Sequence, residues 1–562
     1  MNRQAPIGPL RLAPGLDRLL HYQRSWLRAD LLGGLTVGAM LIPQSMAYAE
    51  IAGMPPEAGF YAVLLALFAY AILGTSRHLG VGPEPGTAIL AATAVGGMAA
   101  GDPVRYAALM AALALAVAAV CLIAAAFRLG FLADLLSRPV LVGYITGIGL
   151  TLISSQISKV TGIPIENDDF FGRIAEMITE LDEIRAATLA MGTATLGLIL
   201  FLRRWPKVPG ALIAVTLATG VTTLFSLADH GIAVVGNIPA GLPALGFPDV
   251  SGSDMAALIP AALGIALVGY SDNVLTARSI SAEHGYRIDP NQEFIALGTC
   301  NLTSGISQGF PVSSSASRSF VPASIGTHSQ LTGVVAALFV AATLLFLRPV
   351  LANFPQAALG SVILAAAIAI IDVAGFKELW RLSRSEFALA AVTALGVMIF
   401  DVLTGVLIAV ALSAAVALWR IARPSDAVLG GASELDGWVA VDDFPTARPL
   451  PGLLVYRFDA PLFFANAEWF HQRVRQALET NPGVEEWIII DFDGVGSIDT
   501  TAIEMLEELL GELPSLGIEV VGVARTNSTT IDRLTRAGLL APAGPIQSFP
   551  TINRAVQRFR NR

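Results

Sequence analysis

Two short segments, far apart in the chain, combine glycine, proline and hydroxyl side chains in a pattern suited to binding an anion. One runs from Leu79 to Thr87 (LGVGPEPGT), and the other from Gln308 to Ser319 (QGFPVSSSASRS). Each is an extended, proline-containing stretch that leads into an apolar helix, which predicts two half-helices beginning within a bilayer. The N-terminus of a half-helix offers free N–H groups and the positive end of its dipole. The two segments therefore predict an anion site where the half-helices meet.

The second segment also carries a cation. Arg318 follows Ser315 and Ser317 in an otherwise uncharged run. A charged side chain inside an apolar segment costs free energy and usually faces a cavity or a partner. We expect Arg318 to complement the anion, with Ser315 and Ser317 donating hydrogen bonds. The structural alternative is that Arg318 pairs with Glu84 or with backbone carbonyls and that the serines only cap the helix.

An internal repeat would relate the two segments. The spacing from Pro83 to Pro311 equals the spacing from Gln44 to Asp272. An inverted repeat in this register would place Gln44 and Asp272 at equivalent positions beside the two half-helices. The sequence thus points to one site by two routes.

Two carboxylates accompany this site. A carboxylate beside an anion repels it unless it is neutralised, and burial favours the protonated form. We expect Asp272 to carry a proton with the anion, or to bind Na⁺ when ionised; alternatively it pairs with Arg278 or caps a broken helix. Glu84 is a second protonatable group, half of an ion pair with Arg318, or an outward-facing side chain.

The composition predicts a membrane protein. Of 562 residues, 54% are hydrophobic and 14% charged, against about 25% charged in soluble domains. Between Leu31 and Ile421 we count apolar runs that, with the interrupted ones included, predict about 14 crossings of about 20 residues each. Residues 1–14 contain no continuous apolar run, so no cleaved signal peptide is expected.

Charge distribution predicts the orientation. If the N-terminus is cytoplasmic and the crossings alternate, most basic loop residues lie inside: Arg77, Arg128, Arg138, Arg203, Arg204, Lys207, Arg278, Arg287, Lys377, Arg381, Arg384, Arg420 and Arg423. The outside stretch 166–183 is acidic. This is the distribution that the positive-inside rule requires, so both termini are predicted to be cytoplasmic.

The composition changes after Pro424. Residues 425–451 are predicted to be a polar linker, and residues 452–562 to be a separate α/β domain. Its strands are expected at 453–458, 487–492 and 518–523, with helices at 467–479 and 500–513. Alternating strands and helices indicate a sheet covered by helices.

The motifs in their order resemble the sulfate permease (SulP) family, also called solute-carrier family 26. The similarity lies in residues 30–38 (DLLGGLTVG), 42–49 (IPQSMAYA), 53–61 (GMPPEAGFY), Gly74 to Arg77 and Gly82-Pro83. The C-terminal domain resembles the STAS domain of these proteins. The resemblance implies a cytoplasmic segment 1–28, a transmembrane domain 29–424 with seven plus seven inverted helices in core and gate domains, and a homodimer.

The resemblance also implies functional residues. Gln44 and Tyr48 match a polar and aromatic pair that contacts substrate, although ordinary helix packing is an alternative. Asp272 matches a glutamate of proton-coupled relatives, and a nearby aspartate serves sodium in bicarbonate carriers, so the coupling ion stays open. Thr500 stands where related domains hold a phosphorylated serine. We favour the simpler reading that Asp499 caps a helix; phosphorylation or nucleotide binding there, and a protein partner, are alternatives.

The sequence gives no sign of an enzyme. It contains no glycine-rich phosphate loop, no metal-ligand cluster and no nucleophile triad, and Cys121 and Cys300 lie far apart in apolar segments. We expect no cofactor and no nucleic acid. The expected function is H⁺-coupled uptake of sulfate or a related oxyanion across a prokaryotic cytoplasmic membrane. Bicarbonate or C4-dicarboxylate symport with H⁺ or Na⁺, an uncoupled exchanger or channel, and a membrane-anchored sensor are the alternatives.

Overall fold

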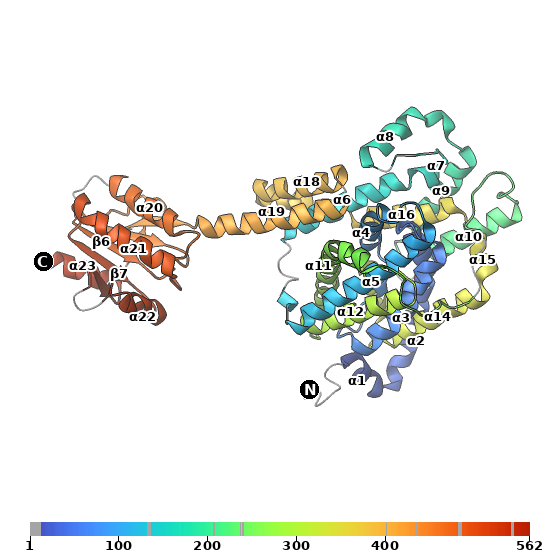
Figure 1. The fold of residues 1–562 in the computed structure, drawn as a ribbon, viewed down its shortest axis with the longest axis horizontal. Helices are drawn as coiled ribbons and strands as arrows, with labels where there is room; N and C mark the ends of the chain where they lie inside the picture. The colour runs from blue at the N-terminus through green and yellow to red at the C-terminus, as the bar shows by residue number, and fades with distance from the viewer. Residues whose placement is uncertain are drawn as a thin grey trace. The chain divides into compact units, whose positions relative to one another are not determined.

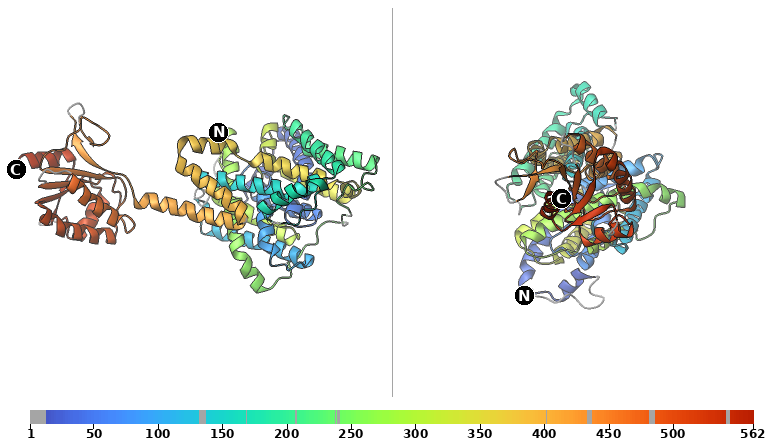
Figure 2. Two further views of the ribbon diagram at one scale, coloured as in Figure 1. Left: turned by 90° about the horizontal axis from the view of Figure 1, so that it is seen from above. Right: turned by 90° about the vertical axis from the view of Figure 1, so that its left-hand side faces the viewer.

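The computed structural model describes residues 13–131, 137–167, 169–205, 208–236, 238, 241–400, 402–432, 437–480, 486–540 and 544–562. The chain forms two compact units, Met1–Ser413 and Ala414–Arg562. The first is almost entirely helical, and the second contains a β-sheet (Figures 1 and 2).

Within the described residues, six helical segments are long and apolar enough to cross a membrane: Arg24–Ile51, Pro56–Leu73, Pro103–Ala126, Arg138–Thr161, Gly252–Glu283 and Gln356–Leu382. Shorter apolar helices accompany them, among them Pro85–Gly96, Ala186–Leu202, Gly210–Leu224 and Leu331–Phe346. The prediction of a helical membrane protein is confirmed. The number of crossings, about 14, remains a prediction.

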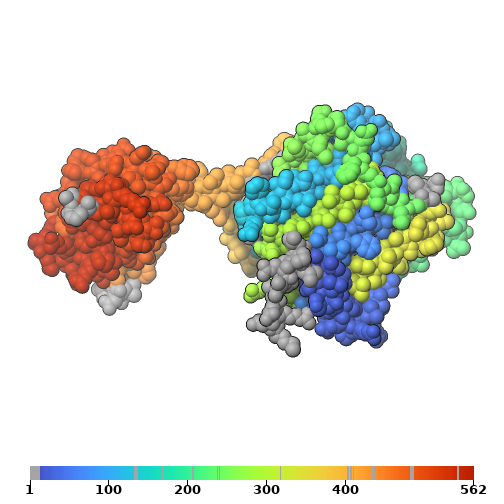
Figure 3. Space-filling view, turned by 60° about the horizontal axis from the view of Figure 1, so that its bottom comes forward, coloured from blue at the N-terminus to red at the C-terminus, as the bar shows by residue number. Residues whose placement is uncertain are grey.

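Eight helices of the first unit pack against one another and are called the core group. They are α2 (Leu27–Ile51), α3 (Pro56–Leu73), α4 (Pro85–Gly96), α5 (Pro103–Ala126), α11 (Gly252–Glu283), α12 (Pro290–Ile306), α13 (Ala316–Ile325) and α14 (Leu331–Phe346). Figure 3 shows α5, α12, α3 and α14 side by side. A Cβ on Gly305 would lie 2.8 Å from the Ala111 carbonyl oxygen, so glycine permits the close approach of α12 to α5.

A second set of helices is called the gate group. It consists of α6 (Arg138–Ser155), α7 (Ile157–Thr161), α8 (Phe170–Thr179), α9 (Ala186–Leu202), α10 (Gly210–Leu224), α16 (Gln356–Ile370), α17 (Val373–Leu382) and α18 (Arg384–Ile399). Helix α2 contacts α10 and α16, and a Lys159–Glu50 ion pair also joins the two groups. The remaining elements of the first unit are α1 (Pro14–Leu20), η2 (Arg24–Trp26), η4 (Leu181–Glu183) and α15 (Arg348–Ala352), while α19 (Val402–Ala422) continues into the second unit.

Two short strands bring the half-helices together. Strand β1 (Val81–Gly82) pairs antiparallel with β2 (Ser313–Ser314), and each leads directly into a helix, α4 or α13. The two prolines do not stand at the same distance from the two helix starts. Pro83 directly precedes the N-cap of α4, whereas Pro311 lies four residues before the N-cap of α13, Ser315. Strand pairing, and not proline, sets where α13 begins, so matching Pro83 to Pro311 is three residues out of register.

The second unit contains a six-stranded sheet in the order β4-β3-β5-β6-β7-β8. The strands are β3 (Asp426–Gly431), β4 (Trp438–Ala440), β5 (Leu453–Phe458), β6 (Trp487–Asp491), β7 (Val520–Ala524) and β8 (Ile546–Phe549). Strands β5 to β8 are parallel. Apolar residues of α20 (Ala467–Thr480), α21 (Thr500–Glu512) and α22 (Ser528–Arg536) join one core, and those of α23 (Ile552–Arg560) join a second. Alternate strand residues face the two cores.

The prediction that residues 425–451 form a linker is corrected, because part of this segment belongs to the sheet. These residues contain β3 and β4, and β3 pairs antiparallel with β5. Only three apolar residues, 427–429, mark β3 in the sequence, and its glycine end packs on the backbone of Arg448. A short strand of this kind is specified by its neighbour in the sheet more than by its own pattern.

Candidate anion site

A cavity of about 460 Å³ lies between the core group and the gate group. We call it the inner cavity. Its core wall consists of Tyr48, the start of α4 at 84–87, residues of α11 including Asp272, strand β2, Ser315 and the first residues of α13. Its gate wall comes from α6, α16 and the end of α9. Both predicted half-helix N-termini therefore line one cavity.

The two half-helix N-termini differ in charge. Glu84 is the N-cap of α4, and its carboxylate accepts a hydrogen bond from the Thr87 N–H at 2.9 Å. The N-cap of α13 is the neutral Ser315. The positive end of α4 is thus already partly neutralised by its own carboxylate, while that of α13 is not. The side chain of Ser317 lies outside the described residues.

Arg318 packs against Gly80 and Gly82 and is not among the residues that line the inner cavity. Its side chain is 0% exposed, and Nη1 donates to Gln44 Oε1 at 3.5 Å. A Cβ on Gly80 would lie 3.0 Å from the Arg318 Cβ. Among the described residues, Nε and Nη2 have no hydrogen-bond partner. A buried guanidinium with two unbonded nitrogens is costly.

Asp272 faces the inner cavity from α11. Its Oδ2 accepts a hydrogen bond from Ser314 Oγ at 3.4 Å, which ties this carboxylate to strand β2. Glu84 lines the same cavity. When both carboxylates are ionised, Arg318 compensates only one of the two charges.

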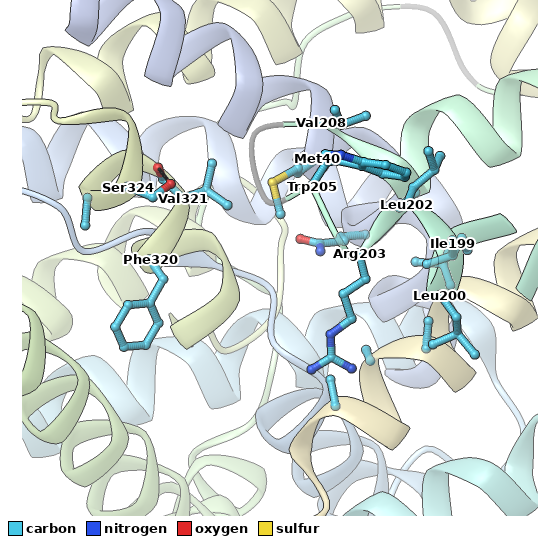
Figure 4. Close-up of a pocket in the computed structure, with 18 of the residues that line it drawn as sticks. Met40, Ile199, Leu200, Leu202, Arg203, Trp205, Val208, Phe320, Val321 and Ser324 are labelled. Atoms are coloured by element: carbon cyan, nitrogen blue, oxygen red, sulfur yellow. Dashed lines mark hydrogen bonds between the residues drawn. The ribbon is translucent and has the colours of Figure 1, made fainter. Parts of the chain in front are cut away.

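Gln44 and Tyr48 lie one helical turn apart on α2. They are 8% and 3% exposed, and both line a second cavity of about 630 Å³, which we call the vestibule. Figure 4 shows Phe320, Val321 and Ser324 on one side of the vestibule and Leu200, Leu202 and Arg203 on the other. The two cavities share Tyr48, Arg203, Phe320, Ala366 and Ala369. They adjoin, and together they outline a route from the inner cavity.

A buried carboxylate that we did not predict organises the core wall. Glu293 is 0% exposed and accepts hydrogen bonds from Tyr70 Oη (2.9 Å), Thr75 N (2.9 Å), Thr75 Oγ1 (2.5 Å), Ser76 N (3.3 Å) and Asn273 Nδ2 (3.0 Å). These donors join the turn before β1 to the neighbour of Asp272 on α11. The available signal was that Glu293 is the last charged residue before the long uncharged stretch 294–317.

Two more residues of the inner cavity were not predicted. Tyr144 and Arg203 line it from the gate side. Tyr144 lies in an apolar helical stretch that shows no periodic polar face, and we assigned Arg203 to a cytoplasmic loop. Neither residue has a local sequence pattern that marks it as part of a site.

The fold and this site define a multi-pass membrane transporter with a C-terminal STAS domain. The Sulfate permease family model matches residues 27–393, and the STAS domain model matches residues 445–555. The chain belongs to the sulfate permease family, whose members are transporters of anions and not enzymes.

Named relatives and solved structures are similar along most of the chain. A "Probable sulfate transporter" of Mycobacterium tuberculosis is 45% identical over 551 residues, covering 98% of each chain. "Sulfate transporter 4.1, chloroplastic" of Arabidopsis thaliana is 29% identical over 98% of this chain and 84% of its own.

Among structures, the murine Solute Carrier 26 family member A9 anion transporter in the inward-facing state gives a TM-score of 0.89 at 24% identity, covering 98% of this chain and 94% of that one. The transmembrane domain of the cyanobacterial bicarbonate transporter BicA gives 0.61 at 20% identity, covering 70% and 98%. At these identities the likeness shows the shared fold.

In the second unit, the predicted cap is confirmed. Asp499 is the N-cap of α21, and its side chain accepts from Ala502 N at 2.8 Å and from Phe464 N at 2.9 Å. Thr500 is the first residue of that helix. The aspartate therefore has a complete structural role at this position.

Proposed function

We propose that this protein takes up sulfate, or a closely related oxyanion, together with protons by alternating access. The anion lies in the inner cavity at the N-terminus of α13, held by backbone N–H groups and by Ser315 and Ser317. The buried Arg318 guanidinium contributes a positive charge near the anion, and Gln44 accepts a hydrogen bond from it. Tyr48 borders the anion from α2.

The charges of the inner cavity support coupling to protons. Arg318 carries one positive charge, and Asp272 and Glu84 carry two negative charges when ionised. A dianion entering a low-dielectric cavity that is already net negative is repelled strongly. Protonation of Asp272, and of Glu84 where it caps α4, removes this repulsion and frees the end of α4. Anion and protons therefore enter together, and acid outside the vesicle favours uptake.

The assignment of sulfate is supported by the names of the relatives, and a tetrahedral oxyanion suits the several donors at the α13 N-terminus. Bicarbonate is the second candidate, supported by the fold shared with a bicarbonate transporter. We further propose a homodimer in a prokaryotic cytoplasmic membrane with both termini in the cytoplasm, on the distribution of basic loop residues. The domain limits 1–28 and 29–424 belong to the same proposal.

The test is uptake of radiolabelled sulfate into proteoliposomes with and without an inward proton gradient. Wild-type protein should be stimulated by the gradient, and Asp272→Asn should lose that stimulation. The matched control is Asp254→Asn, the same substitution near the start of α11, where Asp254 belongs to a capping box outside both cavities. The control should keep the stimulation.

Three results would contradict the proposal. Sulfate uptake that ignores both the gradient and Asp272→Asn would show uncoupled exchange. Stimulation by Na⁺ in place of H⁺ would identify the other coupling ion. Absence of sulfate uptake, with uptake of labelled bicarbonate or fumarate by the same vesicles, would move the substrate to one of those anions.

A further inference from the structure

The gate wall of the inner cavity is apolar apart from two side chains. Helices α6 and α16 contribute Leu141, Ile145, Ile148, Ala366, Ala369 and Ile370, and the two polar residues are Tyr144 and Arg203. Arg203 also lines the vestibule, so it lies toward the route out. Tyr144 is the tyrosine that the gate group contributes to this wall.

The Tyr144 hydroxyl has no hydrogen-bond partner. Tyr144 is 5% exposed, and its Oη is buried without a donor or acceptor among the residues that the structure describes. The hydroxyls of three other tyrosines of the first unit are bonded: Tyr70 to Glu293 at 2.9 Å, Tyr106 to the Ala52 carbonyl at 2.7 Å and Tyr270 to the Pro290 carbonyl at 2.8 Å. Because a buried hydroxyl without a partner is costly, the Tyr144 hydroxyl is available to a partner that the described residues do not supply.

A phenylalanine would fill this position without that cost. The wall around Tyr144 is hydrocarbon, so the hydroxyl adds nothing to packing that a bare ring would lack. The core wall of the same cavity contains Glu84, Asp272 and the N-terminus of α13, where we place the anion. A phenolic O–H is a donor that an anionic oxygen accepts well.

We propose that the Tyr144 hydroxyl is a gate-side ligand of the transported oxyanion. It donates one hydrogen bond to an anion oxygen when the gate group closes on the core group. This inference rests on the proposed function above. An oxyanion held at the N-terminus of α13 has further oxygens that can accept a hydrogen bond from the gate wall. The inference therefore gives the gate group a hydrogen-bond donor to the substrate. The hydrogen bond would then be made in the closed state and lost on opening.

The experiment is Tyr144→Phe in the full-length protein, with sulfate uptake as a function of concentration in proteoliposomes. We expect the KM for sulfate to rise about tenfold, the size expected for one hydrogen bond to a charged group. Thermal unfolding should be unchanged or slightly higher in temperature, because an unpaired hydroxyl has been removed. The matched control is Tyr106→Phe, which loses its bond to Ala52 within the core group; it should lower the unfolding temperature and leave KM unchanged.

The outcomes separate the inference from the proposed function. Tyr144→Phe with wild-type KM overturns the inference while the transport assignment stands. Equal changes in KM for both variants, or a lower unfolding temperature for Tyr144→Phe, show a packing role and overturn it as well. A wild-type protein that takes up no oxyanion removes the proposed function, and the inference with it.

Discussion

At the scale of single residues, a substitution of Arg318 is expected to change stability and transport in opposite directions. The Nε and Nη2 atoms of Arg318 lack partners among the described residues, and the side chain is fully buried. Replacing a fully buried charge that lies in no close ion pair by an apolar side chain of similar volume removes a desolvation penalty of several kcal/mol. Protonation of Asp272 and Glu84 then removes the negative charges that Arg318 had opposed. We therefore expect Arg318→Met to raise the thermal unfolding temperature while reducing sulfate uptake by about 100-fold or more. Uptake in proteoliposomes and unfolding in detergent measure the two effects.

The control for Arg318 is an arginine in an exposed ion pair. Arg105 pairs with Asp254 at 3.1 Å near the start of α11. Arg105→Met should change stability by less than about 1 kcal/mol and leave transport unaffected. A destabilised Arg318→Met protein that still transports sulfate would show that Arg318 is a structural anchor.

At the scale of elements, the site depends on how one turn is held. Glu293 accepts five hydrogen bonds from α3, from the turn before β1 and from α11. That turn leads into β1, whose pairing with β2 sets where α4 and α13 begin. Glu293→Ala leaves several buried donors unpaired, at about 1–3 kcal/mol each. We expect a large loss of thermal stability, measured by unfolding in detergent.

A graded series tests this explanation. Tyr70→Phe removes one donor and leaves the others in place, so it should cost about 1 kcal/mol. Asn273→Ala should cost a similar amount, because it removes the single bond from α11. If Glu293→Ala were no less stable than these two variants, the hydrogen-bond network would not be what holds the turn.

At the scale of the whole molecule, the stability of the second unit is expected to depend on residues 425–451. Strand β3 pairs with β5, and the Asp426 carboxylate accepts from Tyr456 Oη at 2.8 Å and from Arg473 Nε at 2.9 Å. The hydrogen bond with Asp426 raises the pKa of Arg473. A fragment of residues 425–562 should unfold cooperatively, whereas residues 452–562, the limits expected from composition, should be several kcal/mol less stable or aggregate.

Urea unfolding of both fragments, followed by circular dichroism, measures this difference. The parallel strands β5 to β8 are present in both fragments, so a change in stability reports on β3 and β4. Equal midpoints for the two fragments would show that residues 425–451 act as a linker in solution.

The sequence by itself determined the features that local chemistry controls. Apolar runs predicted the membrane helices, glycine and proline marked the two half-helices, and Asp499 was identified as a cap, because each depends on residues close in the chain. It also singled out Glu84, Asp272 and Ser315, which the inner cavity brings together.

Tertiary structure decided the rest. The start of α13 follows from strand pairing with residues more than 200 positions earlier, and β3 follows from its neighbour β5. Three features depend on which distant groups lie within hydrogen-bond reach. They are the bonding of Arg318, the five hydrogen bonds to Glu293 and the absence of a partner for the Tyr144 hydroxyl among the described residues. A sequence pattern shows which donors and acceptors a chain carries, whereas only the packed fold determines which of them are left for a ligand.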